Sequence, residues 1–137
     1  MSTNSIFHYE FTVVETHLDF MGHMNNATYL QVFEEARWEI VVHRGYDYKM
    51  IQKSKKGPVI LDVKLRFSRE VTLRERVRIT TEFLSYRGKV GTLRQTMYKQ
   101  DGTVAAEAEF TTGLFDMVER KLIEPTPEWK MAVGLAE

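Results

Sequence analysis

An aspartate, a histidine and two asparagines stand close together in the segment Asp-Phe-Met-Gly-His-Met-Asn-Asn, which covers positions 19–26. The residues that follow have the pattern of an amphipathic helix, so these polar side chains lie at a helix start. A helix N-terminus exposes unpaired N–H groups and partial positive charge. A carboxylate just upstream could face a carbonyl group whose oxygen those amides bind. That arrangement suits acyl transfer.

Asp19 is the first candidate for chemistry in this segment. Its carboxylate could attack a carbonyl carbon directly or deprotonate a water molecule that does so. The ordinary alternative is that Asp19 caps a turn or the helix, because Asp side chains commonly bond to nearby backbone N–H groups. The residue type and spacing leave both roles for Asp19 open.

The neighbours of Asp19 also have more than one interpretation each. His23 could be a second base, a hydrogen-bond donor to the substrate carbonyl, or a structural histidine bonded to the backbone. Asn25 or Asn26 can serve as the helix N-cap, and a fixed cap would hold an oxyanion-binding amide in place. We favour a supporting role for His23.

Glu34 and Glu35, farther along the expected helix, are rival candidates for the catalytic carboxylate. The more ordinary interpretation is an ion pair with Arg37 or with another charge at an interface. The four histidines of the chain have no metal-ligand spacing on any expected element. We therefore expect no metal site.

Strand and helix periodicities alternate along the chain in a simple order. Positions 7–13 have the two-residue period of a half-buried strand, 27–43 the pattern of a long covered helix, and 46–53 that of a short helix. Four more strands are expected, with half-buried alternation in the first two: 59–67, 76–83, 90–99, and a long last strand from 104 that ends near Met117. Asp101-Gly102 is typical of a tight hairpin, and a short helix is expected from Glu128. The order predicts an α+β fold with an antiparallel sheet packed on one helix.

Length and composition limit the function further. A chain of 137 residues fits a single domain over 1–137, and 19 basic residues balance 19 acidic ones. This balance gives no global electrostatic support for a nucleic-acid partner. The chain has no cysteine, and neither a signal peptide nor a membrane-spanning segment is apparent, so we expect a cytoplasmic protein without membrane insertion.

The motif from Asp19 to Tyr29, continued by Phe33-Glu-Glu-Ala-Arg37, resembles that of the hotdog-fold acyl-CoA thioesterases, in particular the 4-hydroxybenzoyl-CoA thioesterase-like family. The resemblance covers the whole chain. It implies a curved antiparallel sheet of about five strands around a central helix, and subunits paired edge to edge into a homodimer, often a homotetramer, with active sites at the interface. Where many members carry a second acidic residue two positions before the catalytic one, this chain has His17.

The same resemblance implies the roles of the motif residues. Asp19 falls on the catalytic aspartate, and the amide of Asn26 falls on the donor that binds the thioester oxygen. We add His23 to the catalytic group. The candidates for contact with substrate are Gly22, Met24, Asn25 and Tyr29.

The function predicted from this resemblance is hydrolysis of an acyl-CoA to a free acid and coenzyme A, with water as co-substrate and without a cofactor. One alternative is a thioesterase acting on acyl carrier protein, which a basic rim near the site would favour. A second is a hotdog protein that binds acyl thioesters without cleaving them. A hotdog hydratase is disfavoured, because the small-residue run expected beside its aspartate is absent after Asp19.

Overall fold

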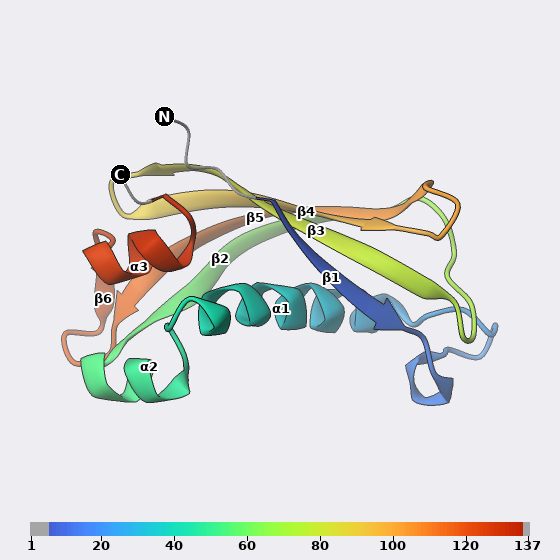
Figure 1. Ribbon diagram of the computed structural model, residues 1–137, viewed down its shortest axis with the longest axis horizontal. Coiled ribbons are helices and arrows are strands. Elements are labelled where there is room, and N and C mark those ends of the chain that lie inside the picture. The colour runs from blue at the N-terminus through green and yellow to red at the C-terminus, as the bar shows by residue number, and fades with distance from the viewer. Residues whose placement is uncertain (1–5, 136–137) are drawn as a thin grey trace.

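The computed structural model describes residues 6–135. A six-stranded sheet curves around one long helix, and two short helices lie toward the end of the molecule where this long helix ends (Figure 1). The elements are β1 (Ile6–Thr12), the 3-10 helix η1 (Glu15–His17), α1 (Asn26–His43), α2 (Tyr48–Ser54), β2 (Lys56–Phe67), β3 (Arg76–Arg87), β4 (Val90–Tyr98), β5 (Val104–Asp116), β6 (Lys121–Ile123) and α3 (Pro127–Ala132).

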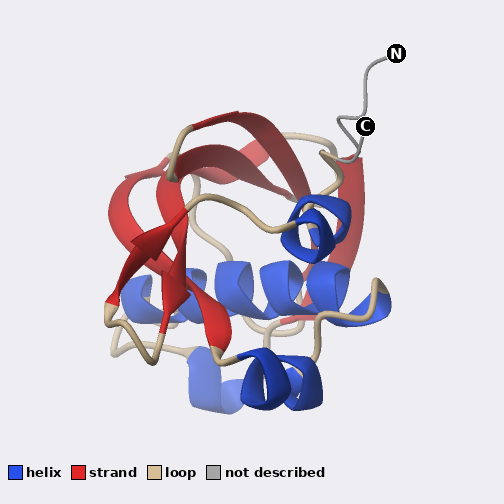
Figure 2. Cartoon of the chain, turned by 90° about the vertical axis from the view of Figure 1, so that its left-hand side faces the viewer, coloured by secondary structure: helices blue, strands red, loops and turns tan. Residues whose placement is uncertain are grey.

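All strand pairs are antiparallel, in the order β1-β3-β4-β5-β2, with β6 paired to the end of β5. The end-on view shows the concave face of the sheet wrapped around α1 (Figure 2). The predicted α+β architecture and its five long strands are confirmed. The three-residue strand β6 was not predicted, because a segment that short has too few residues to show alternation.

The core lies between α1 and the concave face of the sheet. Phe33 of α1 is fully buried, and its ring packs edge-on against Phe110 of β5, with 6.3 Å between ring centroids. The predicted inward residues of β3, from Val77 to Phe83, are buried as expected. Burying one such apolar side chain contributes about 1.5–3 kcal/mol, so these contacts fix α1 under the sheet and fix where its first turn lies.

The prediction that β2 is half-buried was wrong for most of the strand. β2 is an edge of the sheet, and its apolar side chains Ile60, Leu61, Val63 and Phe67 are exposed. The predicted alternation was also wrong at its start, because the register with β5 shifts between Ile60 and Asp62. This bulge puts Ile60, instead of Val59, on the same face as Val63.

Candidate active site

Asp19 lies in a tight loop that is closed by its own backbone. Its amide donates to the carbonyl of His23 at 2.8 Å, and its Oδ1 accepts from the amides of Met21 at 2.9 Å and His23 at 3.1 Å. Gly22 allows the turn because its φ is +81°, in the left-handed region. Asp19 therefore does cap a turn, and it does so with Oδ1 alone, since Oδ2 makes no hydrogen bond within residues 6–135.

The start of α1 follows directly from this loop. Asn25 is the N-cap, and its Oδ1 accepts from the amide of Ala27 at 2.8 Å. Asn26 is the first residue of the helix, and its side chain is exposed. The Asn26 N–H has no hydrogen-bond partner among the described residues. A free donor thus stands at the positive end of the α1 dipole.

The segment between β2 and β3 forms the opposite side of the site. His23 and Thr72 form an isolated antiparallel bridge, and the amide of Met24 donates to the carbonyl of Val71 at 2.7 Å. His23 Nε2 lies 2.9 Å from Oε1 of Glu70. The Asp19 loop and the β2–β3 segment are therefore held together by backbone contacts and by this side-chain pair.

Lys99 of the β4–β5 hairpin anchors the β2–β3 segment. Its Nζ donates to the carbonyl of Glu70 at 2.7 Å and lies 2.9 Å from Oε2 of Glu75. Glu75 in turn accepts from the amide of Thr72 at 2.9 Å. Burial alone would raise the pKa of Glu75, but these hydrogen bonds from Lys99 and Thr72 outweigh burial and lower it.

These segments enclose an open groove at the first turn of α1, which lies at the right-hand end of Figure 1. We call it the Asp19 groove. Its wall contains Asp19, Met21, His23, Met24, Asn26, Tyr29, Phe67, Ser68, Arg69 and Glu70. The structure thus brings together five of the seven predicted site residues in one wall, while Gly22 and Asn25 shape the loop and the helix start behind it.

Tyr29 is a buried residue that lines the Asp19 groove. Its ring is buried and packs edge-on against Phe67, with 5.0 Å between centroids. Burial raises the pKa of the Tyr29 phenol, and the charges of Glu75, Asp19 and Glu70 raise it further. The phenol therefore stays neutral at physiological pH, beside a group of carboxylates.

A family model described as the thioesterase-like superfamily matches residues 13–133. The chain belongs to this superfamily. The match spans the Asp19 groove and all elements from η1 to α3, and it supports the predicted activity of a thioester hydrolase.

Individual relatives agree with this superfamily. The long-chain acyl-CoA thioesterase FadM of Escherichia coli K12 is 29% identical over 108 residues, which are 78% of this chain and 81% of FadM. The crystal structure of the probable thioesterase YbaW from E. coli has a TM-score of 0.81 at 26% identity, over 95% of this chain and 98% of YbaW. A Staphylococcus aureus protein solved in complex with CoA has a TM-score of 0.88 at 20% identity, over 97% and 84% of the two chains. The fold is the hotdog fold.

The rival carboxylates of α1 lie elsewhere. Glu35 accepts a hydrogen bond from the Tyr9 hydroxyl at 3.0 Å, and Glu34 accepts one from Trp38 Nε1 at 3.2 Å. Neither glutamate lines the Asp19 groove. The expected ion pair of either glutamate with Arg37 was wrong for the described residues, because other donors hold both carboxylates.

His17 has a local structural role. Its Nδ1 accepts from the amide of Val14 at 2.9 Å, and its ring lies 4.8 Å from that of Phe11. This histidine therefore fixes the turn that leads from β1 into the Asp19 loop.

Within residues 6–135, no cluster of three or more His, Asp or Glu side chains is arranged to hold a metal ion, and no helix is long and apolar enough to cross a membrane.

Sequence reasoning missed the part of the wall that the β2–β3 segment contributes. Phe67, Ser68 and Glu70 are more than forty residues from Asp19 in the chain, and none of them has a spacing to Asp19 that indicates contact. The only available signal was the change from alternating pattern to charged residues after Phe67, which predicts a strand end. It does not predict which loop the strand end meets.

Proposed function

We propose that this protein is an acyl-CoA thioesterase in which Asp19 is the catalytic base or nucleophile. One observation carries the proposal. Oδ1 of Asp19 is held by two backbone amides while its Oδ2 has no hydrogen bond within residues 6–135, and Asp19 lines the same groove as the Asn26 N–H, which has no partner among those residues. Membership in the thioesterase-like superfamily and the similarity to FadM support the same reaction.

The proposed mechanism uses both groups at once. The thioester carbonyl oxygen accepts a hydrogen bond from the Asn26 N–H, and this bond strengthens as negative charge develops on the oxygen. The free oxygen of Asp19 either attacks the carbonyl carbon or removes a proton from the attacking water. When water attacks, the C–S bond breaks to give the carboxylic acid and the thiol directly. When Asp19 attacks, the C–S bond breaks to give the thiol and an anhydride between the acyl group and Asp19, and water then hydrolyses this anhydride to the carboxylic acid and free Asp19.

His23 has a supporting role in this proposal. Its Nε2 faces the Glu70 carboxylate, and this contact orients the ring in the groove. Nδ1 is left for the substrate or the attacking water, as an acceptor in the neutral ring and as a donor when both ring nitrogens are protonated. Met21, Met24 and Phe67 give the same groove an apolar part for the first carbons of the acyl group. Tyr29, as a neutral phenol, provides a further donor.

The groove favours coenzyme A over an acyl carrier protein as the thiol carrier. A carrier protein is acidic, so its enzyme would need a basic rim. The described wall contains one fully basic side chain, Arg69, against the two carboxylates Asp19 and Glu70. The fixed orientation of Asp19 likewise favours catalysis over binding without cleavage.

We also propose that the protein is a homodimer paired through β2, with further assembly into a tetramer as the family resemblance implies. The edge of β2 carries unpaired backbone groups over a twelve-residue strand. The exposed side chains Ile60, Val63 and Phe67 lie along this edge, and Phe67 is also part of the Asp19 groove. Pairing of two such edges would cover the apolar side chains and place the groove beside the partner.

A cytoplasmic location belongs to the same proposal, since a chain without cysteine gains nothing from an oxidising compartment.

Release of free thiol from a panel of short-chain, long-chain and aromatic acyl-CoAs tests the proposed reaction. We expect saturable thiol release with at least one member of the panel, and a long-chain substrate is the first choice because of the similarity to FadM. Saturable binding of an acyl-CoA without thiol release would instead support the binding protein. Faster release from an acyl carrier protein than from the matching CoA ester would support the carrier-protein enzyme.

A further inference from the structure

The Asp19 loop stands on two short antiparallel arms of the chain. The first arm is residues 17–19 and the second is residues 23–25, and they meet in an isolated antiparallel bridge. At the base of the arms, the amide of Asn25 donates to the carbonyl of His17 at 2.8 Å. Asp19 ends the first arm, and the free N–H at the start of α1 follows the second arm directly. The position of the first arm therefore sets how the Asp19 carboxylate lies relative to that N–H.

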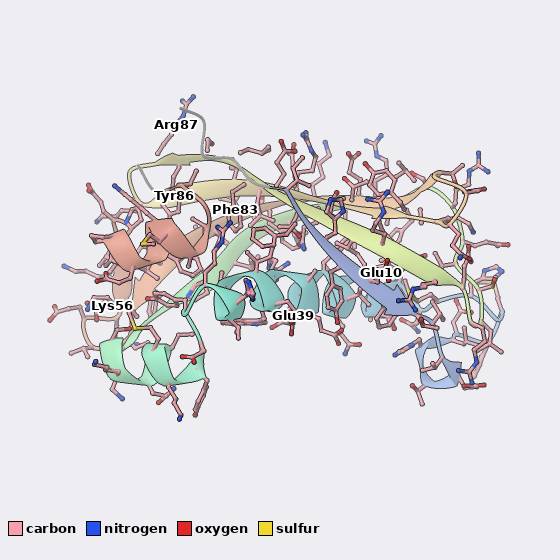
Figure 3. All side chains as sticks on the ribbon, in the orientation of Figure 1. Glu10, Glu39, Lys56, Phe83, Tyr86 and Arg87 are labelled. Atoms are coloured by element: carbon pink, nitrogen blue, oxygen red, sulfur yellow. The ribbon has the colours of Figure 1, made fainter. Side chains whose placement is uncertain are left out.

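The His17 side chain fixes the first arm. Its Nδ1 accepts from the amide of Val14 at 2.9 Å, and its own amide donates to the carbonyl of Val14 at 2.9 Å. Its ring lies against that of Phe11 near the end of β1. Glu10, labelled near the same end of β1 in Figure 3, precedes Phe11 and pairs with Arg76 on the other face of the strand. His17 does not line the Asp19 groove, so its effect on the site passes through the backbone.

The residue that the His17 ring holds is anchored on its other side. Val13 is fully buried, its amide donates to the carbonyl of Glu75 at 3.0 Å, and its carbonyl accepts from the amide of Arg74 at 2.8 Å. Val14, the next residue, is thereby tied to the β2–β3 segment. The bond from the Val14 amide to His17 Nδ1 extends this anchor to the first arm.

Only the neutral imidazole makes this bond. Nδ1 accepts a hydrogen bond when the ring proton is on Nε2, and a second proton turns Nδ1 into a donor that faces the N–H of Val14. The ordinary pKa of an imidazole is about 6.5, and that of an aspartic acid is about 3.9. An imidazole acceptor is therefore lost in mildly acid solution, where a carboxylate or amide acceptor would be retained.

The charged groups around the His17 ring have partners of their own. Glu15 of the same turn pairs with Arg74 at 2.7 Å, and Glu75 of the facing segment pairs with Lys99 at 2.9 Å. Asp19 accepts from two amides of its own loop. No carboxylate oxygen of residues 6–135 lies within ion-pair distance of the ring. The described residues thus offer a protonated ring no ion pair in place of the bond that it loses.

We propose that neutral His17 is a positioning residue for thioester hydrolysis. Its Nδ1 holds the first arm, and with it Asp19, in place opposite the Asn26 N–H, and protonation of the ring releases the arm. This inference rests on the proposed function, because it requires Asp19 and the Asn26 N–H to act on the same carbonyl group. It adds a loss of rate in mildly acid solution that starts outside the catalytic groups.

Two substitutions separate the hydrogen bond from the ring. His17→Phe keeps an aromatic ring against Phe11 and removes the acceptor. At about pH 8 its kcat for thiol release should be about 3-fold to 10-fold lower than that of the wild type, with KM nearly unchanged, as expected for loss of one hydrogen bond. His17→Asn places an amide oxygen near the position of Nδ1 and should restore most of the rate.

The pH profile distinguishes positioning from a merely structural role. Between about pH 8 and pH 5.5, the kcat of the wild type should fall relative to that of His17→Asn by about 3-fold to 10-fold. Asp19 and His23 titrate in both proteins, so the ratio of the two profiles reports the ring of His17. His43→Asn is the control, because His43 is exposed at the end of α1 and should leave the profile unchanged.

Amide NMR spectra test the same coupling without substrate. The resonances of Val14 and Asn26 should both shift as His17 is protonated, and this shared shift should be absent in His17→Asn. A constant ratio of the two pH profiles would overturn the proposal, and so would a folded His17→Phe with the wild-type kcat, or an Asn26 resonance that does not follow the protonation of His17. Absence of thiol release together with the shared shift would contradict the proposed function and leave the coupling of His17 to Asn26 standing.

Discussion

His23 and Glu70 meet across the Asp19 groove, with Nε2 of the histidine 2.9 Å from Oε1 of the glutamate. The two residues come from different segments, since His23 precedes α1 and Glu70 follows β2. This pair is the one side-chain link that the described residues show between the two walls of the groove. It therefore determines how the imidazole is presented to a substrate.

We expect Glu70→Ala to lower the rate of thiol release by about 2-fold to 5-fold, because an exposed pair of this kind is worth up to about 1 kcal/mol. The effect should depend on His23. Kinetics of the double variant with His23→Ala test this dependence. If Glu70→Ala lowers the rate as much without the imidazole as with it, Glu70 does not act through His23.

The neighbouring asparagines Asn25 and Asn26 should differ in what their side chains contribute. Asn25→Ala removes the cap on the Ala27 amide and should lower the free energy of unfolding by about 1 kcal/mol. Asn26→Ala should change it little, because the exposed Asn26 side chain makes no hydrogen bond within residues 6–135, and the backbone N–H is retained. Thermal unfolding of both variants provides the comparison, and an equal loss in the two would contradict the assignment of Asn25 as the cap.

Glu75 should make stability depend on pH in the acid range. Because its pKa in the folded chain is lower than the ordinary 4.5, its contribution is present above pH 4.5 and is lost as the pH falls through the lowered pKa. Glu75→Gln should therefore be less stable than the wild type at pH 7, by about 1.5–3 kcal/mol, and the difference should shrink below pH 4.5. Urea unfolding of the wild type and of Glu75→Gln, at pH 7 and below pH 4.5, measures this difference in the free energy of unfolding.

Glu10→Gln is the matched control for Glu75→Gln. Glu10 pairs with Arg76 on the surface, with about half of each side chain exposed, so its loss should cost less than about 1 kcal/mol. A Glu75 variant with the same small effect as Glu10→Gln would show that Lys99 and Thr72 do not hold the β2–β3 segment through Glu75.

The β2 edge should determine assembly. Val63→Lys places a charge on this edge and should shift the protein toward monomers in analytical ultracentrifugation, because an edge lysine disfavours strand pairing. Val90→Lys is a close control, since Val90 is 38% exposed and Val63 is 39% exposed. It lies at the start of β4, away from the β2 edge, and should leave assembly unchanged. An unchanged oligomer with Val63→Lys would exclude pairing through this part of β2.

The sequence predicted the fold well where its patterns were long. The 18-residue helix α1 and the inward residues of β3 were found by their periods of 3.6 and two residues. Strand β2 was less well predicted, because a bulge shifts its alternation and because an edge strand with apolar side chains has the same pattern as a half-buried one. Periodicity reports which residues share a face, and it does not report what covers that face.

The sequence predicted only those parts of the candidate site that lie within one short segment of the chain. This segment contains Asp19, His23 and the cap of α1. Because these residues are close in the chain, they are also close in space. The contact of His23 with Glu70 joins segments 47 positions apart and depends on how the sheet curves. The hydrogen bond between Arg37 and Gln95 joins residues that are 58 positions apart, and the sequence did not predict it for the same reason.

Thiol release by wild type and Asp19→Asn, measured side by side on the preferred acyl-CoA, tests the central claim most directly. Asparagine keeps an Oδ1 that can accept from the amides of Met21 and His23, so the loop should remain folded and the thermal midpoint nearly unchanged. We predict a rate about 10²-fold to 10⁴-fold lower in the variant, as expected for the loss of a catalytic base. An Asp19→Asn protein that is folded and releases thiol at the wild-type rate would contradict the assignment of Asp19 as the catalytic residue.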